Sequence, residues 1–228
     1  MPGWVLTRAV VSFMSSLVVA LGGCLPASVT LESFFLKPSA EMAQSPASYN
    51  YPYDELYVPV AGDRRVCIWH VKTANPKAVV VIIPGSDKNK SRYLVGLPVF
   101  VPHGYDMILM DYEGYGTGTT ARPELERLSE DGYAVVRFAQ SLHERVVVFG
   151  ASAGGPTAVR VAADLDLAAV ILEAPLALQS EVELWRRDQR VVIPPLWHLA
   201  NLWVHPQIPD SFDIFKHVQN VSEPKLIM

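Results

Sequence analysis

An apolar run that leads into a serine flanked by glycines constrains the fold of this chain more than any other stretch. Residues 146–154 are Val-Val-Val-Phe-Gly-Ala-Ser-Ala-Gly, and residues 156–163 are compatible with a helix. A side chain presented at the apex of a tight strand-to-helix turn needs neighbours without bulk, which Gly150 and Gly154 provide. The stretch therefore predicts a buried strand, a sharp turn and a helix that present Ser152 as a nucleophile. A purely structural glycine-rich turn is the alternative.

Other segments predict strands that alternate with helices. Residues 78–83 are apolar at every position, which is typical of a strand buried on both faces of a parallel sheet. Residues 106–111 and 167–175 predict two further strands, and residues 123–142 carry apolar side chains at roughly helical spacing. This alternation favours an α/β fold with a doubly wound, mainly parallel sheet and helices on both faces.

Two shorter elements complete the first half of the predicted domain. Residues 55–60 and 65–71 predict a hairpin, because two strand-like runs flank a Gly-Asp turn. A helix is expected from about Arg92, and Pro98 is expected to end or kink it.

The N-terminal residues predict export and attachment to a membrane. Arg8 precedes an apolar stretch, residues 9–21, which is shorter than the ~20 residues that a spanning helix needs and is typical of a signal peptide. The stretch ends in two glycines and Cys24, which resembles a bacterial lipobox. Cleavage there would leave a lipid-modified cysteine as an anchor in the cell envelope. An ordinary secretory peptide, cut after Ala20 or near Ala27, is the alternative.

The predicted organisation is therefore a signal peptide, a tether and one domain. Residues 1–23 form the signal peptide, residues 24–53 the Pro- and Ser-rich tether, and residues 54–228 the α/β domain. Within that domain, residues 176–218 break the alternation of strand and helix and predict a small cap. Residues 223–228 begin one more strand, so the sheet is expected to be incomplete at its C-terminal end.

Composition limits the possible partners. The formal net charge is −4 and no basic cluster is present, which argues against binding of nucleic acid. The chain has two cysteines, so lipid modification of Cys24 would leave Cys67 without a partner for a disulfide. The six histidines lack the spacing of metal ligands, so we expect neither a metal nor another cofactor.

Four segments, taken in order, resemble the α/β-hydrolase family. They are residues 83–86 (Ile-Pro-Gly-Ser), 111–116 (Asp-Tyr-Glu-Gly-Tyr-Gly), 150–154 (the serine turn) and 172–175 (Leu-Glu-Ala-Pro). The likeness runs from about Asp54 to Met228 and is greatest to the short-cap branch of serine aminopeptidase-like and depalmitoylase-like hydrolases. Two residues depart from the family pattern, since Pro84 replaces a histidine and Glu113 replaces an arginine.

The resemblance implies a hydrolase of an ester, thioester or amide, acting on a small-molecule, acyl or peptide substrate. Ser152 would attack the carbonyl and form an acyl-enzyme. The backbone N–H groups of Ser86 and Ala153 would hold the oxyanion, and Gly150 and Gly154 would shape the nucleophile elbow.

The resemblance also implies an acid and a histidine that follow the strand begun at residues 223–228. Those positions lie beyond Met228, so the sequence predicts a truncated form of the enzyme. Within the chain, Glu173 and His217 are secondary candidates for the acid and the base, and His198 and His205 lie in the expected cap. The alternative function is a non-catalytic or vestigial hydrolase-like lipoprotein that lacks both groups.

Overall fold

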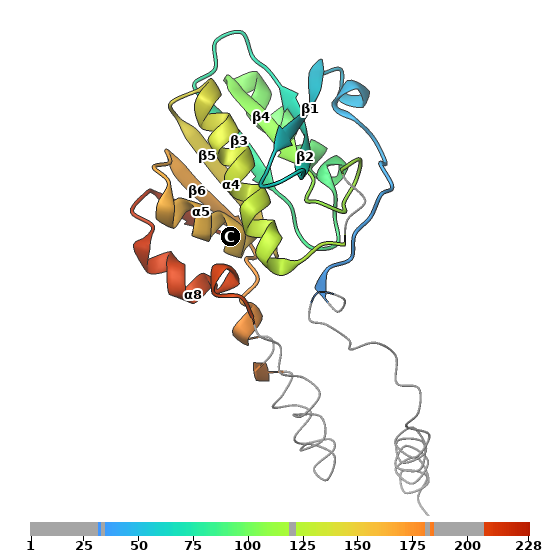
Figure 1. Ribbon diagram of the computed structural model, residues 1–228. Coiled ribbons are helices and arrows are strands. Elements are labelled where there is room, and N and C mark those ends of the chain that lie inside the picture. Colours follow the sequence, from blue (N-terminus) through green and yellow to red (C-terminus); the bar gives the residue numbers. More distant parts are fainter. Residues whose placement is uncertain (1–31, 33–34, 119–121, 181–182, 185–207) are drawn as a thin grey trace, which may run out of the picture. The chain divides into compact units, whose positions relative to one another are not determined.

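The computed structural model describes residues 32, 35–118, 122–180, 183–184 and 208–228 of the chain (Figure 1). Cys24, the expected signal peptide and the histidines at 198 and 205 lie outside these residues. Among the residues described, no helix combines the length and the apolar character that crossing a membrane requires.

The described strands form a seven-stranded sheet in the order β1-β2-β4-β3-β5-β6-β7. The strands β1 and β2 form an antiparallel hairpin, β2 pairs with β4 antiparallel, and every further pairing is parallel. The prediction of a mainly parallel sheet is therefore confirmed. The strands are β1 (Tyr53–Pro59), β2 (Arg65–Val71), β3 (Ala78–Ile83), β4 (Tyr105–Met110), β5 (Val146–Ala151), β6 (Ala169–Glu173) and β7 (Lys225–Ile227).

The central strands are apolar at every position because both of their faces are buried. In β3, Val79 and Val81 join a core cluster on one face, while Val80 and Ile82 join a second cluster on the other face. All six residues of the strand are buried. This is the two-sided burial that the sequence of residues 78–83 predicts.

Two helices, α4 (Leu125–Leu142) and α5 (Gly154–Asp164), lie side by side over one face of the sheet (Figure 1). Their apolar sides belong to the first core cluster, together with Val79 and Val81. The helix expected between residues 123 and 142 is thus observed as α4.

The other face carries a run of short helices where the sequence predicted one helix from about Arg92. The run consists of η2 (Lys90–Gly96), α3 (Leu97–Phe100) and η3 (Val101–His103). The helix that contains Arg92 ends at Gly96, shortly before Pro98, and Pro98 lies in the first turn of α3, where no backbone N–H is needed.

The described part of the expected tether packs on the domain. Leu36 is buried in the first core cluster, and η1 (Pro46–Tyr49) precedes β1. The Lys37 N–H donates to the Ser86 carbonyl over 2.8 Å, and the Ser39 carbonyl accepts the Gly116 N–H over 2.9 Å. These bonds hold the segment against the loops that follow β3 and β4, so this part of residues 24–53 differs from the tether that the sequence predicted.

The described end of the expected cap also belongs to the domain. Its elements are η4 (Asp210–Phe212), α8 (Ile214–His217) and η5 (Val218–Asn220). Phe212 and Ile214 are buried in the first core cluster, against the helix α5. The cap expected at residues 176–218 therefore does not extend over residues 210–218, whereas the tryptophans at 185, 197 and 203 lie outside the described residues.

The strand expected from residues 223–228 is observed as β7, which pairs parallel with β6. The Met228 N–H donates to the Leu172 carbonyl over 2.9 Å, and the Met228 carbonyl accepts the Ala174 N–H over 2.9 Å. All three residues of β7 are exposed.

Candidate active site

Ser152 lies at the apex of the turn that joins β5 to α5. Its φ is +48°, in the left-handed region that residues other than glycine rarely adopt, and the residue is exposed to solvent. Backbone strain of this kind costs of the order of 1–3 kcal/mol and is typical of functional sites. The geometry is that of a nucleophile elbow, in which the hydroxyl projects above the carboxyl end of the sheet.

Each glycine of this turn occupies a place where a Cβ has no room. A Cβ on Gly150 would stand 2.6 Å from the Ala158 Cβ and 2.7 Å from the Gly154 carbonyl oxygen. A Cβ on Gly154 would run into the carbonyl oxygens of Ile83 and Pro84. The two elbow glycines predicted from the sequence are thus required by the close approach of backbone to backbone.

Residues at and just after the end of β6 hold the elbow through backbone hydrogen bonds. The Ser152 N–H donates to the Glu173 carbonyl, and the Ser152 carbonyl accepts the Leu176 N–H, each over 2.9 Å. Ala174 has a φ of +41°, and a Cβ on Gly155 would stand 2.6 Å from the Pro175 Cβ. The segment 172–175 is therefore shaped by its contact with the elbow.

The loop after β3 lies directly against Ser152. A Cβ on Gly85 would stand 3.3 Å from the Ser152 Cβ, so the two backbones meet with little space between them. The neighbouring residues Ser86 and Ala153 carry the two N–H groups predicted to hold an oxyanion. In the described part of the chain, neither N–H donates to a backbone or side-chain acceptor. Ala153 stands at the N-terminus of α5, whose dipole favours a negative charge.

Residues 111–116 support the loop after β3 through hydrogen bonds and an ion pair. The fully buried Asp111 carboxylate accepts the Lys90 N–H over 2.7 Å and also pairs with the Lys90 ammonium. Tyr115 donates its hydroxyl proton to the Ser86 carbonyl over 2.6 Å. Gly116 has a φ of +54°, and a Cβ there would overlap the Asp111 carboxylate. The segment therefore positions the Ser86 backbone.

Glu113, which stands where the family pattern has arginine, contacts the turn of the β1–β2 hairpin and the helix α4. Its carboxylate pairs with Arg64 over 2.7 Å, and its N–H donates to the Asp131 carboxylate over 2.9 Å. Arg64 also pairs with Asp131 over 2.6 Å. Burial raises the pKa of Asp131 to about 7. These contacts connect the loop after β4 to the turn before β2 and to α4.

Glu173 and His217, the secondary candidates for the acid and the base, lie apart in the structure. The Glu173 carbonyl accepts the Ser152 N–H, so this residue lies beside the elbow, and it is exposed to solvent. His217 is buried on α8, where Nε2 lies 2.8 Å from the Asp210 carbonyl and Nδ1 lies 3.4 Å from Arg160. Arg160 follows Ser152 by eight residues, which is about 12 Å along a helix. His217 is therefore held toward the far end of α5.

Sequence reasoning missed Tyr93 on η2. Its hydroxyl accepts the Gly85 N–H over 2.8 Å and lies 3.5 Å from the position of a Gly85 Cβ. Burial raises the pKa of Tyr93 to about 12, with a further contribution from the charges of Glu173 and Asp87. No pattern in the sequence links residue 93 to residue 85, because only the fold of η2 brings the ring back to the loop.

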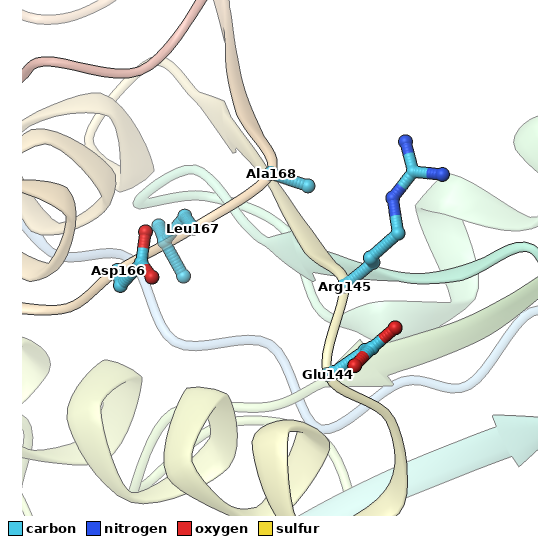
Figure 2. Close-up of a pocket in the computed structure, with 5 residues that line it drawn as sticks. All are labelled: Glu144, Arg145, Asp166, Leu167 and Ala168. Carbon is cyan, nitrogen blue, oxygen red and sulfur yellow. The ribbon is translucent and has the colours of Figure 1, made fainter.

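A separate pocket lies at the opposite end of the strands from Ser152. It has a volume of about 320 Å³ and is lined by Glu144 and Arg145, before β5, and by residues 166–168, before β6 (Figure 2). The amino ends of both strands border this pocket, whereas the elbow follows the carboxyl end of β5. It is therefore not part of the nucleophile site. Among the described residues, no group of three or more His, Cys, Asp or Glu side chains is placed to hold a metal ion.

A seven-stranded, mainly parallel sheet with a strained serine at such an elbow defines an α/β hydrolase. Residues 74–221, more than half of the chain, match the family described as serine aminopeptidase, S33. The chain belongs to this family of hydrolases, and the resemblance seen in the sequence is confirmed.

One relative and two solved structures are similar to this chain. The chain is 29% identical to phospholipase YtpA of Bacillus subtilis over 140 residues, which are 57% of this chain and 54% of that protein. The match thus spans about half of the relative's length. The Pyrococcus furiosus esterase Pf2001 has the same fold, with a TM-score of 0.65, 12% identity, and coverage of 85% of this chain and 76% of its own. An α/β hydrolase from Vibrio vulnificus superposes with a TM-score of 0.61, 15% identity, and coverage of 79% and 64%.

Proposed function

We propose that the protein is a serine hydrolase that cleaves ester, thioester or amide bonds through an acyl-enzyme on Ser152. The observation that carries this proposal is the strained φ of +48° at Ser152, which holds its hydroxyl exposed beside the loop of Gly85. A strained backbone conformation of this kind persists only where the surrounding structure enforces it. Here the Glu173 carbonyl and the glycines of the elbow enforce it.

The geometry supports a two-step reaction. The Ser152 oxygen would attack the substrate carbonyl as a general base takes up its hydroxyl proton, and the developing oxyanion would accept hydrogen bonds from the N–H groups of Ser86 and Ala153. One such donor typically contributes about 3 kcal/mol to transition-state stabilisation. The base would pass the proton to the leaving group, whose departure would give the acyl-enzyme. Water, deprotonated by the same base, would then attack the ester carbonyl, so that the bond to the Ser152 oxygen breaks, the acid is released and the serine regains its proton.

Among the three bond types, we propose a carboxylic ester as the substrate. A phospholipase is among the relatives, and an esterase is among the solved structures that share the fold. The family description, serine aminopeptidase, makes an amide the competing substrate. Purified protein should therefore hydrolyse a p-nitrophenyl acyl ester faster than an acyl thioester or an amino-acid p-nitroanilide. Faster cleavage of the anilide would contradict the assignment to esters.

Labelling with a fluorophosphonate tests the nucleophile directly. We expect one adduct per chain, located on Ser152 by mass spectrometry, and none in the Ser152→Ala variant. The reagent reports on the activated serine without any assumption about the substrate. An unlabelled wild-type chain, or equal labelling of the variant, would refute the proposed mechanism.

A non-catalytic binding protein is the second candidate, because the described histidines engage groups other than Ser152. His217 contacts Asp210 and Arg160, and His70 contacts Asp106. A serine without a base is a poor nucleophile. Saturable binding of an acyl ester without turnover, together with an unlabelled Ser152, would favour this candidate.

We further propose that the protein is exported and anchored in the bacterial cell envelope through lipid on Cys24. The apolar residues 9–21 and the two glycines before Cys24 support this location. Cells that express the full chain should incorporate radioactive palmitate into it, and the Cys24→Ser variant should lose the label. Incorporation that survives this substitution would refute the anchor, whereas Cys67→Ser serves as the matched control.

A further inference from the structure

The hydroxyl of Tyr93 lies at the nucleophile site with its own proton available. The oxygen accepts the Gly85 N–H over 2.8 Å, so this bond uses a lone pair of the oxygen and not its hydrogen. Among the described residues, Gly85 is the hydrogen-bond partner of the Tyr93 side chain. The phenolic O–H is therefore left to donate to a group that enters the site.

The Tyr93 oxygen and the Ser152 Cβ both lie beside Gly85. The point where a Gly85 Cβ would stand is 3.5 Å from the Tyr93 oxygen and 3.3 Å from the Ser152 Cβ. Gly85 directly precedes Ser86, whose N–H is one of the two proposed oxyanion donors. Tyr93 therefore borders the loop that carries one of the two proposed oxyanion donors.

The surroundings keep the phenol protonated and in place. The ring packs partly buried against the second core cluster, which includes Ile82 and Leu94. The pKa of Tyr93 is raised to about 12 by burial and, to a smaller extent, by the charges of Glu173 and Asp87. The hydroxyl is therefore a donor throughout the neutral and mildly alkaline range.

We propose that Tyr93 is a catalytic residue whose hydroxyl donates a third hydrogen bond to the oxyanion formed at Ser152. This proposal rests on the proposed function. It also places a side-chain donor beside the loop in which Pro84 stands where the family pattern has a histidine. The group acts where charge develops in the reaction, so its contribution is to the rate of the acylation step.

The first test measures the rate of Ser152 modification by a fluorophosphonate in wild type, Tyr93→Phe and Tyr105→Phe. Tyr105 is the matched control, because its ring packs on Phe100 at the amino end of β4, far along the strand from the elbow. We expect the rate to fall about 100-fold in Tyr93→Phe and to stay within about twofold of wild type in Tyr105→Phe. A rate in Tyr93→Phe within about threefold of wild type would overturn the proposal.

The second test separates donation to the oxyanion from simple support of Gly85. Incorporation of 3,5-difluorotyrosine at position 93 lowers the pKa of the phenol and leaves its oxygen able to accept the Gly85 N–H. As the pH rises through the phenol titration, followed by ultraviolet absorbance, we expect the modification rate to fall relative to wild type with the same midpoint. Parallel pH profiles for the two proteins would overturn the catalytic role, since phenolate still supports Gly85.

The two proposals fail in different ways. Absence of Ser152 modification in the wild-type chain would overturn both the proposed function and the role of Tyr93. Efficient wild-type modification with an unchanged rate in Tyr93→Phe would overturn the role of Tyr93 alone and leave Ser152 as the nucleophile.

Discussion

At the scale of single residues, the site depends on positions where one atom more would not fit. Gly150 and Gly154 exclude any Cβ because backbone and the Ala158 methyl occupy the space. Ser152 and Ala174 hold positive φ angles directly after the adjacent strands β5 and β6. The cost of these conformations is offset by hydrogen bonds between the elbow and the end of β6, such as the bond from the Ser152 N–H to the Glu173 carbonyl.

Substitution of an elbow glycine should therefore cost more than the loss of backbone freedom alone. Gly150→Ala places a methyl group 2.6 Å from the Ala158 Cβ, and we expect the free energy of unfolding to fall by about 2–3 kcal/mol. Gly62→Ala is the matched control, since Gly62 has a φ of +68° but nothing within 4 Å of its missing Cβ. It should cost about 1 kcal/mol from strain alone. Urea denaturation measures both values, and equal losses would contradict the steric argument.

At the scale of elements, the carboxyl ends of β3 and β4 carry loops that depend on each other. The loop after β4 supplies Asp111, whose carboxylate holds both the N–H and the ammonium of Lys90 at the start of η2. Lys90 also lies over the ring of Trp69, with 4.8 Å between its Nζ and the ring centroid. A buried ammonium of this kind is tolerated only with its countercharge.

Removal of the Asp111 charge should destabilise the chain more than removal of the whole pair. We expect Asp111→Asn to lower the free energy of unfolding by about 3–5 kcal/mol, because the Lys90 ammonium stays buried without a partner. The double variant Lys90→Met, Asp111→Asn should be more stable than Asp111→Asn alone. Urea denaturation of wild type, both single variants and the double variant gives the coupling energy. Additive losses would contradict a direct interaction.

The elements of this fold were largely predictable, whereas the contacts between distant segments were not. Strands such as residues 78–83 are apolar at every position because both faces are buried, and that pattern is visible in the sequence. The elbow was predictable because its glycines are required locally. Tyr93, by contrast, reaches Gly85 only through the path of η2, and the packing of Leu36 and Phe212 into the core depends on surfaces that the folded sheet creates.

At the scale of the whole molecule, stability should depend on the protonation of His70, which is buried on β2 beside Asp106. Burial lowers the pKa of His70 below its ordinary 6.5, and this effect exceeds the rise that the Asp106 hydrogen bond causes. Below about pH 6.5 the unfolded chain therefore binds a proton that the folded chain does not. The contribution of neutral His70 is present above this pH and is lost as the pH falls through the folded pKa.

This argument predicts a difference between two histidine variants. In His70→Gln, the free energy of unfolding should fall less steeply between pH 6.5 and pH 5 than in wild type, because the titrating group is absent. His103→Gln is the matched control, since His103 is exposed and contacts the Val99 carbonyl over 2.8 Å. Its profile should follow that of wild type. Urea denaturation at several pH values measures the slope of the free energy of unfolding against pH. An unchanged slope in His70→Gln would show that a group other than His70 causes the acid sensitivity of the fold.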